Sequence, residues 1–332
     1  MLTRRLLLAA PALLPLAARA EADPRLEPAL AAAGALAPLH NLIVARHGQV
    51  IAERHYRGPP PDRPANVKSV SKSVIAALVG AAIARGHLDG ADQPIAPILR
   101  DRLPREADPR LARVTIGNLL SMQAGLERTS GASYGQWVAS RDWVRAALAR
   151  PFVAEPGGPM LYSTGNTHLL SAILTRVTGR STHALARDWL AGPLDIALPP
   201  WPRDPQGIFF GGNDMLISPR GLLRFAEMHR LNGQAVNGQE VLRPDWIAAC
   251  WTPRTASAFT GDAYGYGWFL RPVGQQPRFY AWGFGGQMAH VLPGLGLSVV
   301  MTSDPRQRSG GAGGHARALH ALVEQAIVPA LA

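Results

Sequence analysis

Strand-forming segments stand at both ends of this chain with a long helical block between them, and this order limits the folds available to it. Near the start, residues 41–45 and 50–56 flank Arg46-His47-Gly48-Gln49, a pattern typical of a β-hairpin. Near the end, further short β-rich runs separated by turns cover residues 264–270, 279–282, 288–292 and 297–303. We therefore expect one antiparallel sheet built from both ends of the chain.

The middle of the chain has helical rather than strand periodicity. From Ser69, apolar residues recur at three- and four-residue steps as far as Gly86. Further helices are expected at residues 26–36, 115–122, 141–149, 168–177, 182–190, 219–231 and 316–327. The pattern predicts an α+β fold, in which an antiparallel sheet flanked by terminal helices carries an all-helical lobe. The sheet lobe would comprise about 21–60 and 232–332, and the helical lobe about 61–231.

The first twenty residues are typical of a secretory signal. Arg4 and Arg5 precede an apolar run over residues 6–18, and Ala18-Arg19-Ala20 places small residues where a signal peptidase cuts. The paired arginines favour the twin-arginine route. The apolar run is too short to span a bilayer, so no stable membrane insertion is expected. We expect cleavage near Ala20, which would leave one domain over residues 21–332. The mature protein would be periplasmic or secreted.

Composition argues against several other classes of protein. Cys250 is the only cysteine, so no internal disulfide can form, and its apolar surroundings predict a buried thiol. The formal net charge is +11, but the basic residues are scattered singly, which is not the pattern of a nucleic-acid-binding protein. The ten histidines include no H-E-x-x-H, and His315 and His320 are expected in solvent. We expect no metal and no cofactor, and the oligomeric state stays open.

The sharpest chemical signal is S-x-x-K at Ser69 and Lys72, at the start of the first helix of the middle block. A serine hydroxyl needs a base within hydrogen-bond reach, and residues three apart on a helix share one face. Free N–H groups at a helix N-terminus can also hold an oxyanion. The alternative is a chance match, because this short motif is common. A nucleophile-elbow hydrolase built on G-x-S-x-G is disfavoured.

Lysine usage supports the assignment of Lys72 as a base. The chain has only two lysines, Lys68 and Lys72, among 34 basic residues. Arginine keeps its proton at any usable pH, whereas a lysine shielded from water can lose it. Lys68 weakens this reasoning, since a surface charge would explain it equally well.

The sequence resembles the serine β-lactamase and penicillin-recognising superfamily. Within it, the sequence is most similar to the class C β-lactamase-like esterases and amidases related to 6-aminohexanoate-dimer hydrolases. The resemblance covers roughly residues 38–305. Ser69-Val70-Ser71-Lys72 matches the nucleophile and lysine of that family. The resemblance implies a β-lactamase-like fold and a two-step acyl transfer that needs no cofactor.

A second block of the resemblance is Leu161-Tyr162-Ser163-Thr164-Gly165-Asn166. It implies that Tyr162 is the acid/base partner of Ser69 and Lys72, with a phenol pKa lowered by nearby ammonium groups. The family asparagine is replaced by Thr164, and Asn166, two residues later, is a candidate to compensate as a substrate-binding residue. The alternative for Tyr162 is a core aromatic.

The third block is Trp282-Gly283-Phe284-Gly285-Gly286-Gln287, at the place of the family K-T-G. The resemblance implies that the N–H of Gln287 joins that of Ser69 in an oxyanion hole. Gly285 and Gly286 would let the backbone approach the substrate, although strand glycines also mark plain bends. Phe284 stands where lactamases hold a carboxylate-binding lysine, which argues against penicillin turnover.

These observations predict a serine hydrolase that cleaves a small-molecule ester or amide. Within this class the alternatives are a D-alanyl-D-alanine peptidase and a true β-lactamase. From other classes, two candidates remain. One is a catalytically inactive penicillin-binding-like envelope-binding module, and the other is a periplasmic scaffold that uses its positive charge on envelope polymers.

Overall fold

The computed structural model describes residues 22–308 and 314–331, so the expected signal over 1–20 lies outside the described residues. One antiparallel sheet of eight strands organises the molecule, in the order β2-β1-β10-β9-β8-β7-β6-β5. Its strands are β1 Leu39–Arg46, β2 Gln49–His55, β5 Thr255–Ala256, β6 Ala263–Tyr264, β7 Phe269–Leu270, β8 Phe279–Gly283, β9 Gln287–Leu292 and β10 Leu297–Ser303. Two further strands, β3 Ala65–Asn66 and β4 Leu216–Ile217, pair separately.

The two ends of the chain meet at the β1–β10 pair. Ile43 lies opposite Val300, and Val44 lies opposite Val299. Side chains alternate between the faces of a strand, so Ile43 joins one hydrophobic cluster while Val44 joins the other. Because both faces of β1 and β10 are buried, a slip of one residue would move every side chain to the wrong core. The expected sheet built from both termini is confirmed.

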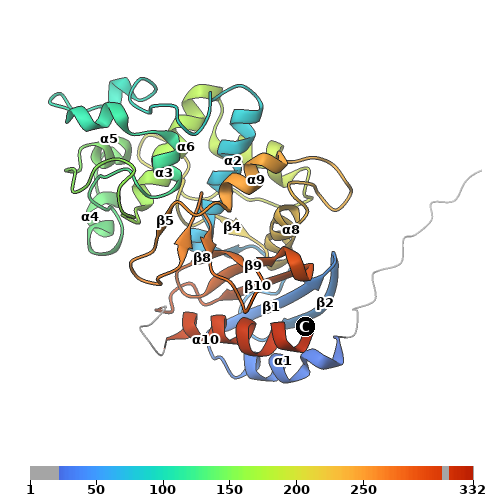
Figure 1. Cartoon of the computed structure of the whole chain (residues 1–332). Helices are drawn as coiled ribbons and strands as arrows, with labels where there is room; N and C mark the ends of the chain where they lie inside the picture. The colour runs from blue at the N-terminus through green and yellow to red at the C-terminus, as the bar shows by residue number, and fades with distance from the viewer. Residues whose placement is uncertain (1–21, 309–313, 332) are drawn as a thin grey trace, which may run out of the picture.

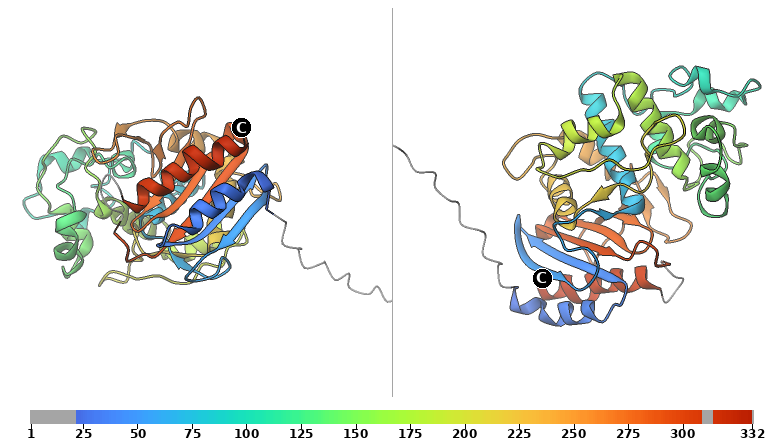
Figure 2. Two further views of the ribbon diagram at one scale, coloured as in Figure 1. Left: turned by 90° about the horizontal axis from the view of Figure 1, so that it is seen from below. Right: turned by 180° about the vertical axis from the view of Figure 1, so that it is seen from behind.

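Helices cover both faces of this sheet (Figure 1). On one face lie α1 Glu27–Gly34 and the C-terminal run of α10 His315–Ala321, a π-helical turn over Leu322–Ile327 and α11 Val328–Leu331. Seen from that side, α1 and the C-terminal helix run next to each other across the strands (Figure 2). On the other face α8 Pro219–Arg230 packs against β1, β9 and β10. Residues 219–230 therefore lie on the sheet, although the sequence grouped them with the helical lobe.

The helical lobe surrounds α2 Ser71–Ala84, which is apolar on every side and buried along its first twelve residues. The remaining helices of the lobe and of its border with the sheet are α3 Ile116–Leu120, α4 Tyr134–Val138, α5 Trp143–Leu148, α6 Thr164–Thr178, α7 Thr182–Ala186 and α9 Pro244–Cys250. The α2 helix has no space for a side chain at Gly80, where an added Cβ would lie 2.2 Å from the ring of Trp246. Cys250 is buried, as expected.

One expected strand, residues 264–270, is instead a tight hairpin of β6 and β7. Tyr264 pairs with Phe269, and the chain reverses between them through Gly267 at a φ of +77°. A positive φ is open to glycine at little cost, so the Gly265-Tyr266-Gly267 run turns where alternating aromatic residues suggested a continuous strand.

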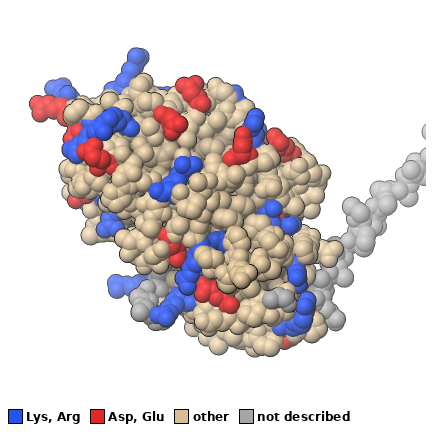
Figure 3. Space-filling model, viewed as in Figure 1, with Lys and Arg blue, Asp and Glu red and all other residues tan. Residues whose placement is uncertain are grey.

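Two features of the surface bear on partners. Within the described residues, no helix combines the length and apolarity that crossing a bilayer requires. On the face in Figure 3, Lys and Arg side chains are interspersed with Asp and Glu, and no broad area carries one sign of charge.

Candidate active site

Ser69 lies in a single 3₁₀ turn, Lys68–Val70, that runs directly into α2. The turn and helix place Lys72 one turn beyond Ser69, and its Nζ donates to Ser69 Oγ at 3.0 Å. The same nitrogen donates to the carbonyl of Gly212 at 2.6 Å, which ties it to the loop before β4. The structure thus brings together the two residues of the S-x-x-K motif.

The Lys72 amine is 1% exposed, and this burial lowers its pKa to about 7. The negative charge of Asp214 opposes the shift but does not cancel it. Near neutral pH a large share of the Lys72 side chains therefore carries no charge. An uncharged amine in contact with a hydroxyl can accept its proton.

Lys68 is paired rather than free. Its Nζ donates to Asp214 Oδ1 at 2.8 Å, and Asn66 Nδ2 donates to the same oxygen at 2.8 Å. Lys68 and Asp214 both have left-handed backbone, with φ of 49° and 62°. Such conformations are strained for residues other than glycine and collect at functional sites. Lys68 is therefore a partly exposed, ion-paired residue at the wall of the cavity in front of Ser69.

Tyr162 approaches Ser69 from a pocket of aromatic rings. Its ring lies against Phe259, Tyr264 and Phe269, with centroids 5.7, 6.3 and 6.3 Å away. Burial raises the pKa of the phenol, and a hydrogen bond with the Ser69 side chain lowers it by less. The expected lowered pKa is wrong, because apolar rings rather than permanent ammonium groups dominate the surroundings. Tyr162 keeps its proton at neutral pH.

Thr164 faces the same cluster, whereas Asn166 does not. The hydroxyl of Thr164 lies 3.4 Å from Lys72 Nζ and forms a hydrogen bond of 2.9 Å with Ser130 Oγ. Ser130 Oγ also accepts from the backbone N–H of Thr164 at 2.8 Å. Asn166 is buried two residues further along α6, about half a turn away from Thr164, and does not line the cavity.

The turn between β8 and β9 packs directly onto the turn that carries Ser69. An added Cβ at Gly283 would lie 2.4 Å from the carbonyl oxygen of Val67, so only glycine allows this approach. The carboxamide of Gln287 points away toward β10, where it donates to Ser303 O at 2.8 Å and accepts from Ser303 N at 3.1 Å. Gln287 is fully buried and does not line the cavity, and its side chain is not free for a substrate.

Gly285 and Gly286, in the turn between β8 and β9, do not line the cavity. Both have positive φ, and added Cβ atoms would meet the carbonyl of Asp304 at Gly285 and the side chain of His315 at Gly286. Their lack of a side chain serves the turn and the packing of the C-terminal segment. Phe284, between Gly283 and Gly285, is 48% exposed and does line the cavity.

A cavity of about 720 Å³ opens in front of Ser69. Its lining residues are Lys68, Ser69, Arg128, Ser130, Gly131, Tyr134, Tyr162, Thr164, Asn213, Asp214, Phe259, Trp282, Phe284 and Pro305. The volume is in the range that encloses a small organic ligand. Within the described part of the chain, no group of three or more His, Cys, Asp or Glu side chains is arranged to hold a metal ion.

The chain contains one G-x-S-x-G match, Gly131 to Gly135, so the motif is not absent from the sequence. In the structure Ser133 ends a 3₁₀ turn and precedes α4, so no strand leads into it. Its hydroxyl accepts from Arg150 Nη2 at 3.4 Å. A nucleophile elbow requires a strand-to-helix turn that exposes its serine, so this match is not one.

Several residues of the site lie in segments whose sequence does not indicate that they belong to it. Asp214, Ser130, Arg128 and the Gly212 carbonyl come from loops without periodicity, and only tertiary packing brings them to Ser69. The scarcity of lysine was the one available pointer toward Lys68.

Comparison with known proteins identifies the family of the chain. The family model described as Beta-lactamase matches residues 25–323. A 6-aminohexanoate-dimer hydrolase from Paenarthrobacter ureafaciens is 27% identical over 291 residues, which cover 80% of this chain and 70% of that protein.

Two solved structures share the fold. A penicillin-binding protein homologue from Caulobacter crescentus superposes with a TM-score of 0.74 at 19% identity, over 93% of this chain and 98% of that one. EstCE1, a hydrolase with promiscuous acyltransferase activity, superposes with a TM-score of 0.72 at 19% identity, over 90% and 96%. Since the family model spans nearly the whole described chain, and both the fold and the expected resemblance agree with it, this chain belongs to the beta-lactamase family of hydrolases.

Proposed function

We propose that this protein is a serine hydrolase that cleaves esters or amides through an acyl-enzyme on Ser69. One observation carries the proposal: Lys72 Nζ lies 3.0 Å from Ser69 Oγ, and burial holds the pKa of this amine at about 7. A buried, largely neutral amine in contact with a serine hydroxyl is the arrangement of a nucleophile and its base.

In the acylation step, the lone pair of Lys72 Nζ accepts the hydroxyl proton as Ser69 Oγ attacks the substrate carbonyl carbon. The carbonyl π electrons move to the oxygen, and a tetrahedral oxyanion forms. Gly212 O stays hydrogen-bonded to the ammonium that results. Asp214 favours this charged state, since its carboxylate raises the pKa of Lys72.

The oxyanion would be held by the backbone N–H groups of Ser69 and Gln287. The close approach of Gly283 to Val67 supports this part of the proposal, because it sets the start of β9 beside the turn that carries Ser69. Gln287 has its side chain tied to Ser303, so its backbone is fixed in place.

Tyr162 would act as a proton donor. Because its raised pKa keeps the phenol protonated, it can give a proton to the leaving alkoxide or amine as the tetrahedral state collapses. The proton taken by Lys72 then returns through the phenol oxygen. In deacylation, water attacks the ester carbon of the acyl-enzyme, loses a proton to the same relay and releases Ser69.

Short esters and linear amides fit this site better than β-lactams. Phe284 stands at the cavity where a carboxylate-binding lysine would lie in lactamases, and Thr164 replaces the family asparagine. Relatives described as a 6-aminohexanoate-dimer hydrolase and as a promiscuous acyltransferase support linear acyl substrates. We also propose export, on the basis of the signal pattern over residues 1–20.

A substrate panel tests the proposal. The purified protein is assayed with p-nitrophenyl butyrate, the linear dimer of 6-aminohexanoate, a D-alanyl-D-alanine peptide and a chromogenic cephalosporin, each with wild type and Ser69→Ala. We expect the ester or the linear amide to exceed the cephalosporin in kcat/KM by about a hundredfold or more, with the difference set by transition-state contacts. Ser69→Ala is expected to abolish turnover.

Each other outcome replaces the proposal with a defined alternative. A dominant cephalosporin rate makes the protein a β-lactamase, and a dominant peptide rate makes it a cell-wall peptidase. If no substrate is turned over but the protein sediments with peptidoglycan in a salt-sensitive manner, it is an envelope-binding module.

A further inference from the structure

The charges that line the active-site cavity do not balance. Lys68 and Asp214 neutralise each other across 2.8 Å, and Lys72 is buried beneath Ser69. The remaining charged lining residue is Arg128, whose side chain is exposed.

Arg128 has no counter-ion within the residues that the structure describes. Its neighbour Glu127 forms an ion pair with Arg150 instead, and no described carboxylate is paired with the Arg128 guanidinium. An arginine with five free donors at the wall of a cavity is suited to bidentate binding of a carboxylate. A cavity lined with one sign of unbalanced charge also attracts the opposite charge from solution.

We propose that Arg128 forms a carboxylate-binding subsite, so that the preferred substrates are esters or amides that carry a carboxylate on the acyl or the leaving-group side. This inference rests on the proposed function and names its substrate class. The lysine expected at Phe284 in lactamases is absent, so the anion would be recognised by a different lining segment, the one after α3.

Hydrogen bonds connect Ser69 to the segment that carries Arg128. Hydrogen bonds of 3.0, 3.4 and 2.9 Å lead from Ser69 Oγ through Lys72 and Thr164 to Ser130 Oγ. Arg128 stands two residues before Ser130, a span of at most about 7 Å of backbone. The contact between Ser130 and Thr164 therefore links the segment that carries Arg128 to the cluster around Ser69, and both residues line the same cavity.

The test uses two pairs of substrates that differ by one carboxylate. Mono-p-nitrophenyl glutarate and p-nitrophenyl butyrate place the charge on the acyl side, while 4-acetoxybenzoate and p-tolyl acetate place it on the leaving-group side. Wild type, Arg128→Gln and Arg105→Gln are compared by the ratio of kcat/KM for the charged to the neutral member. Arg105 is an exposed arginine that does not line the cavity.

We expect Arg128→Gln to lower this ratio in at least one pair by about tenfold, mainly through KM, as loss of a charge-assisted bidentate contact predicts. Arg105→Gln should leave both ratios within twofold of wild type. A charge reversal, Arg128→Glu, should shift the preference toward p-nitrophenyl 6-aminohexanoate, whose chain ends in an ammonium group.

The outcomes separate this inference from the proposed function. If wild type hydrolyses the neutral esters but Arg128→Gln changes neither ratio, the carboxylate subsite is wrong and the hydrolase stands. If wild type and Ser69→Ala are equally inactive on all four esters and on the linear dimer of 6-aminohexanoate, both proposals are wrong.

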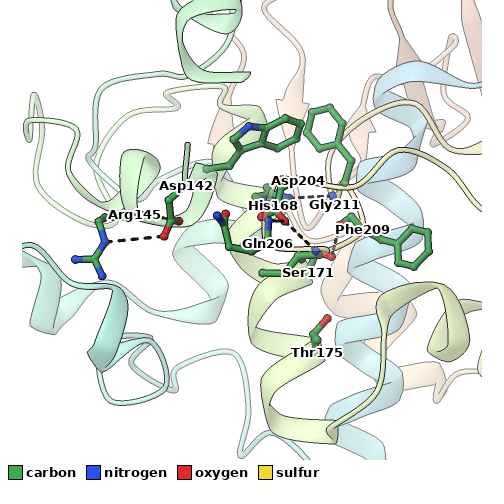
Figure 4. Close-up of polar contacts among 12 residues, drawn as sticks. Asp142, Arg145, His168, Ser171, Thr175, Asp204, Gln206, Phe209 and Gly211 are labelled. Carbon is green, nitrogen blue, oxygen red and sulfur yellow. Dashed lines mark hydrogen bonds and ion pairs between the residues drawn. The ribbon is translucent and has the colours of Figure 1, made fainter. Parts of the chain in front are cut away.

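A different observation concerns the support of Lys72. His168 on α6 and Asp204, in the loop after the π-helical turn Arg187–Ala191, form a buried pair, with Nε2 and Oδ2 3.0 Å apart and both side chains 0% exposed (Figure 4). The backbone N–H of Gly211 donates to His168 Nδ1 at 3.4 Å. Because Nδ1 accepts, the ring proton is on Nε2 and is donated to Asp204. Gly212, the next residue, supplies the carbonyl that accepts from Lys72.

The geometry points to His168 and Asp204 as positioning residues that hold the Gly211–Gly212 loop against Lys72, which rests on the proposed role of Lys72. An added Cβ at Gly211 would lie 2.2 Å from Thr167 O, so the loop is pressed onto α6 at this point. Asp204→Asn tests the pair with little change in shape. An amide nitrogen facing His168 Nε2 would move the ring proton to Nδ1, and Gly211 would lose its acceptor.

We expect Asp204→Asn to lower kcat for p-nitrophenyl butyrate by about tenfold or more with KM within about twofold, since positioning acts on the reacting groups. The matched control is Thr182→Val. It breaks a buried hydroxyl contact of 2.7 Å with Ser171, which lies on α6 as His168 does. If Thr182→Val lowers kcat equally at the same loss of Tm, or Asp204→Asn acts only on KM, the positioning role is wrong.

Discussion

At the scale of single residues, the charge state of Lys72 is set by two opposing influences. Burial lowers the pKa of its amine to about 7, and the carboxylate of Asp214 raises it. Asp214 is also the partner of Lys68, so its removal would leave a second ammonium group unbalanced near Ser69. The pH dependence of turnover therefore reports directly on this group of three residues.

We predict that kcat/KM rises with pH through about 7 and then levels off. The sign follows from the role of the base: only the neutral amine accepts a proton, and it becomes the main form above the pKa of Lys72. Asp214→Asn should move the midpoint to lower pH, since both the lost carboxylate and the unpaired Lys68 disfavour a charged Lys72. The profile is measured by release of p-nitrophenol at its isosbestic wavelength.

The control for this profile is Asp195→Asn, which removes an exposed carboxylate paired with Arg224. Its midpoint should equal that of wild type. A midpoint for Asp214→Asn at or above the wild-type value would contradict the account of Lys72.

Tyr162→Phe is predicted to lower kcat by about a hundredfold or more with a small change in KM, the usual range for loss of a general acid. Phenylalanine keeps the ring contacts with Phe259 and Phe269, so the cavity wall is preserved. Tyr56→Phe, which loses a remote hydrogen bond to Leu30 O, serves as the control. An unchanged kcat in Tyr162→Phe would remove the phenol from the mechanism.

At the scale of elements, the sequence predicted those segments whose periodicity matches their burial. The β1–β2 hairpin and α2 could be predicted because two strand-forming runs flank Arg46-His47-Gly48-Gln49 and α2 repeats apolar residues at helical steps. The β6–β7 hairpin could not be predicted, because its alternating aromatic residues indicated a continuous strand and not a turn at glycine. The position of the loop that ends in Asp214 could not be predicted either. Its contacts with the site join residues far apart in the sequence.

The joint between the β8–β9 turn and the turn of Ser69 is the element contact on which activity depends most. We predict that Gly283→Ala lowers kcat/KM by about tenfold or more, because its Cβ would collide with the carbonyl of Val67 and displace Ser69. Gly135→Ala, where an added Cβ meets no atom within 4 Å, should have wild-type activity. The comparison needs only steady-state kinetics and a melting curve for each variant. Equal activity in both variants would contradict the tight joint.

At the scale of the whole molecule, the sheet lobe contains buried polar groups that the site does not use. Burial lowers the pKa of His229 to about 4 and of His320 to about 3, and it also lowers the pKa of His290 well below its ordinary value. Both ring nitrogens of His290 are without a hydrogen-bond partner among the described residues. The expectation of a solvated His320 is wrong, because the ring packs against Tyr280 beneath the C-terminal helix. Five-residue spacing alone could not show which side of the helix is covered.

These histidines predict that the protein loses stability as the pH falls. In the unfolded chain they take up protons near pH 6.5, whereas in the folded protein they stay neutral to much lower pH. The contribution of these histidines to stability is therefore complete above about 6.5 and decreases below it, by about 1.4 kcal/mol per pH unit for each group. Melting temperatures measured between pH 8 and pH 5 should fall accordingly. His290→Phe should flatten the dependence, while exposed His87→Gln should not, and a pH-independent Tm would contradict this.

The central claim is that Ser69 is a nucleophile activated by its contact with Lys72, and covalent labelling tests it most directly. A fluorophosphonate probe followed by peptide mass spectrometry should place one phosphonyl group on Ser69 of the wild type and none on Ser69→Ala. Lys72→Met should label far more slowly, and Ser71→Ala, which alters the neighbouring hydroxyl, should still be labelled at Ser69. An unlabelled wild type, or Ser69→Ala labelled to the same extent, would contradict the account.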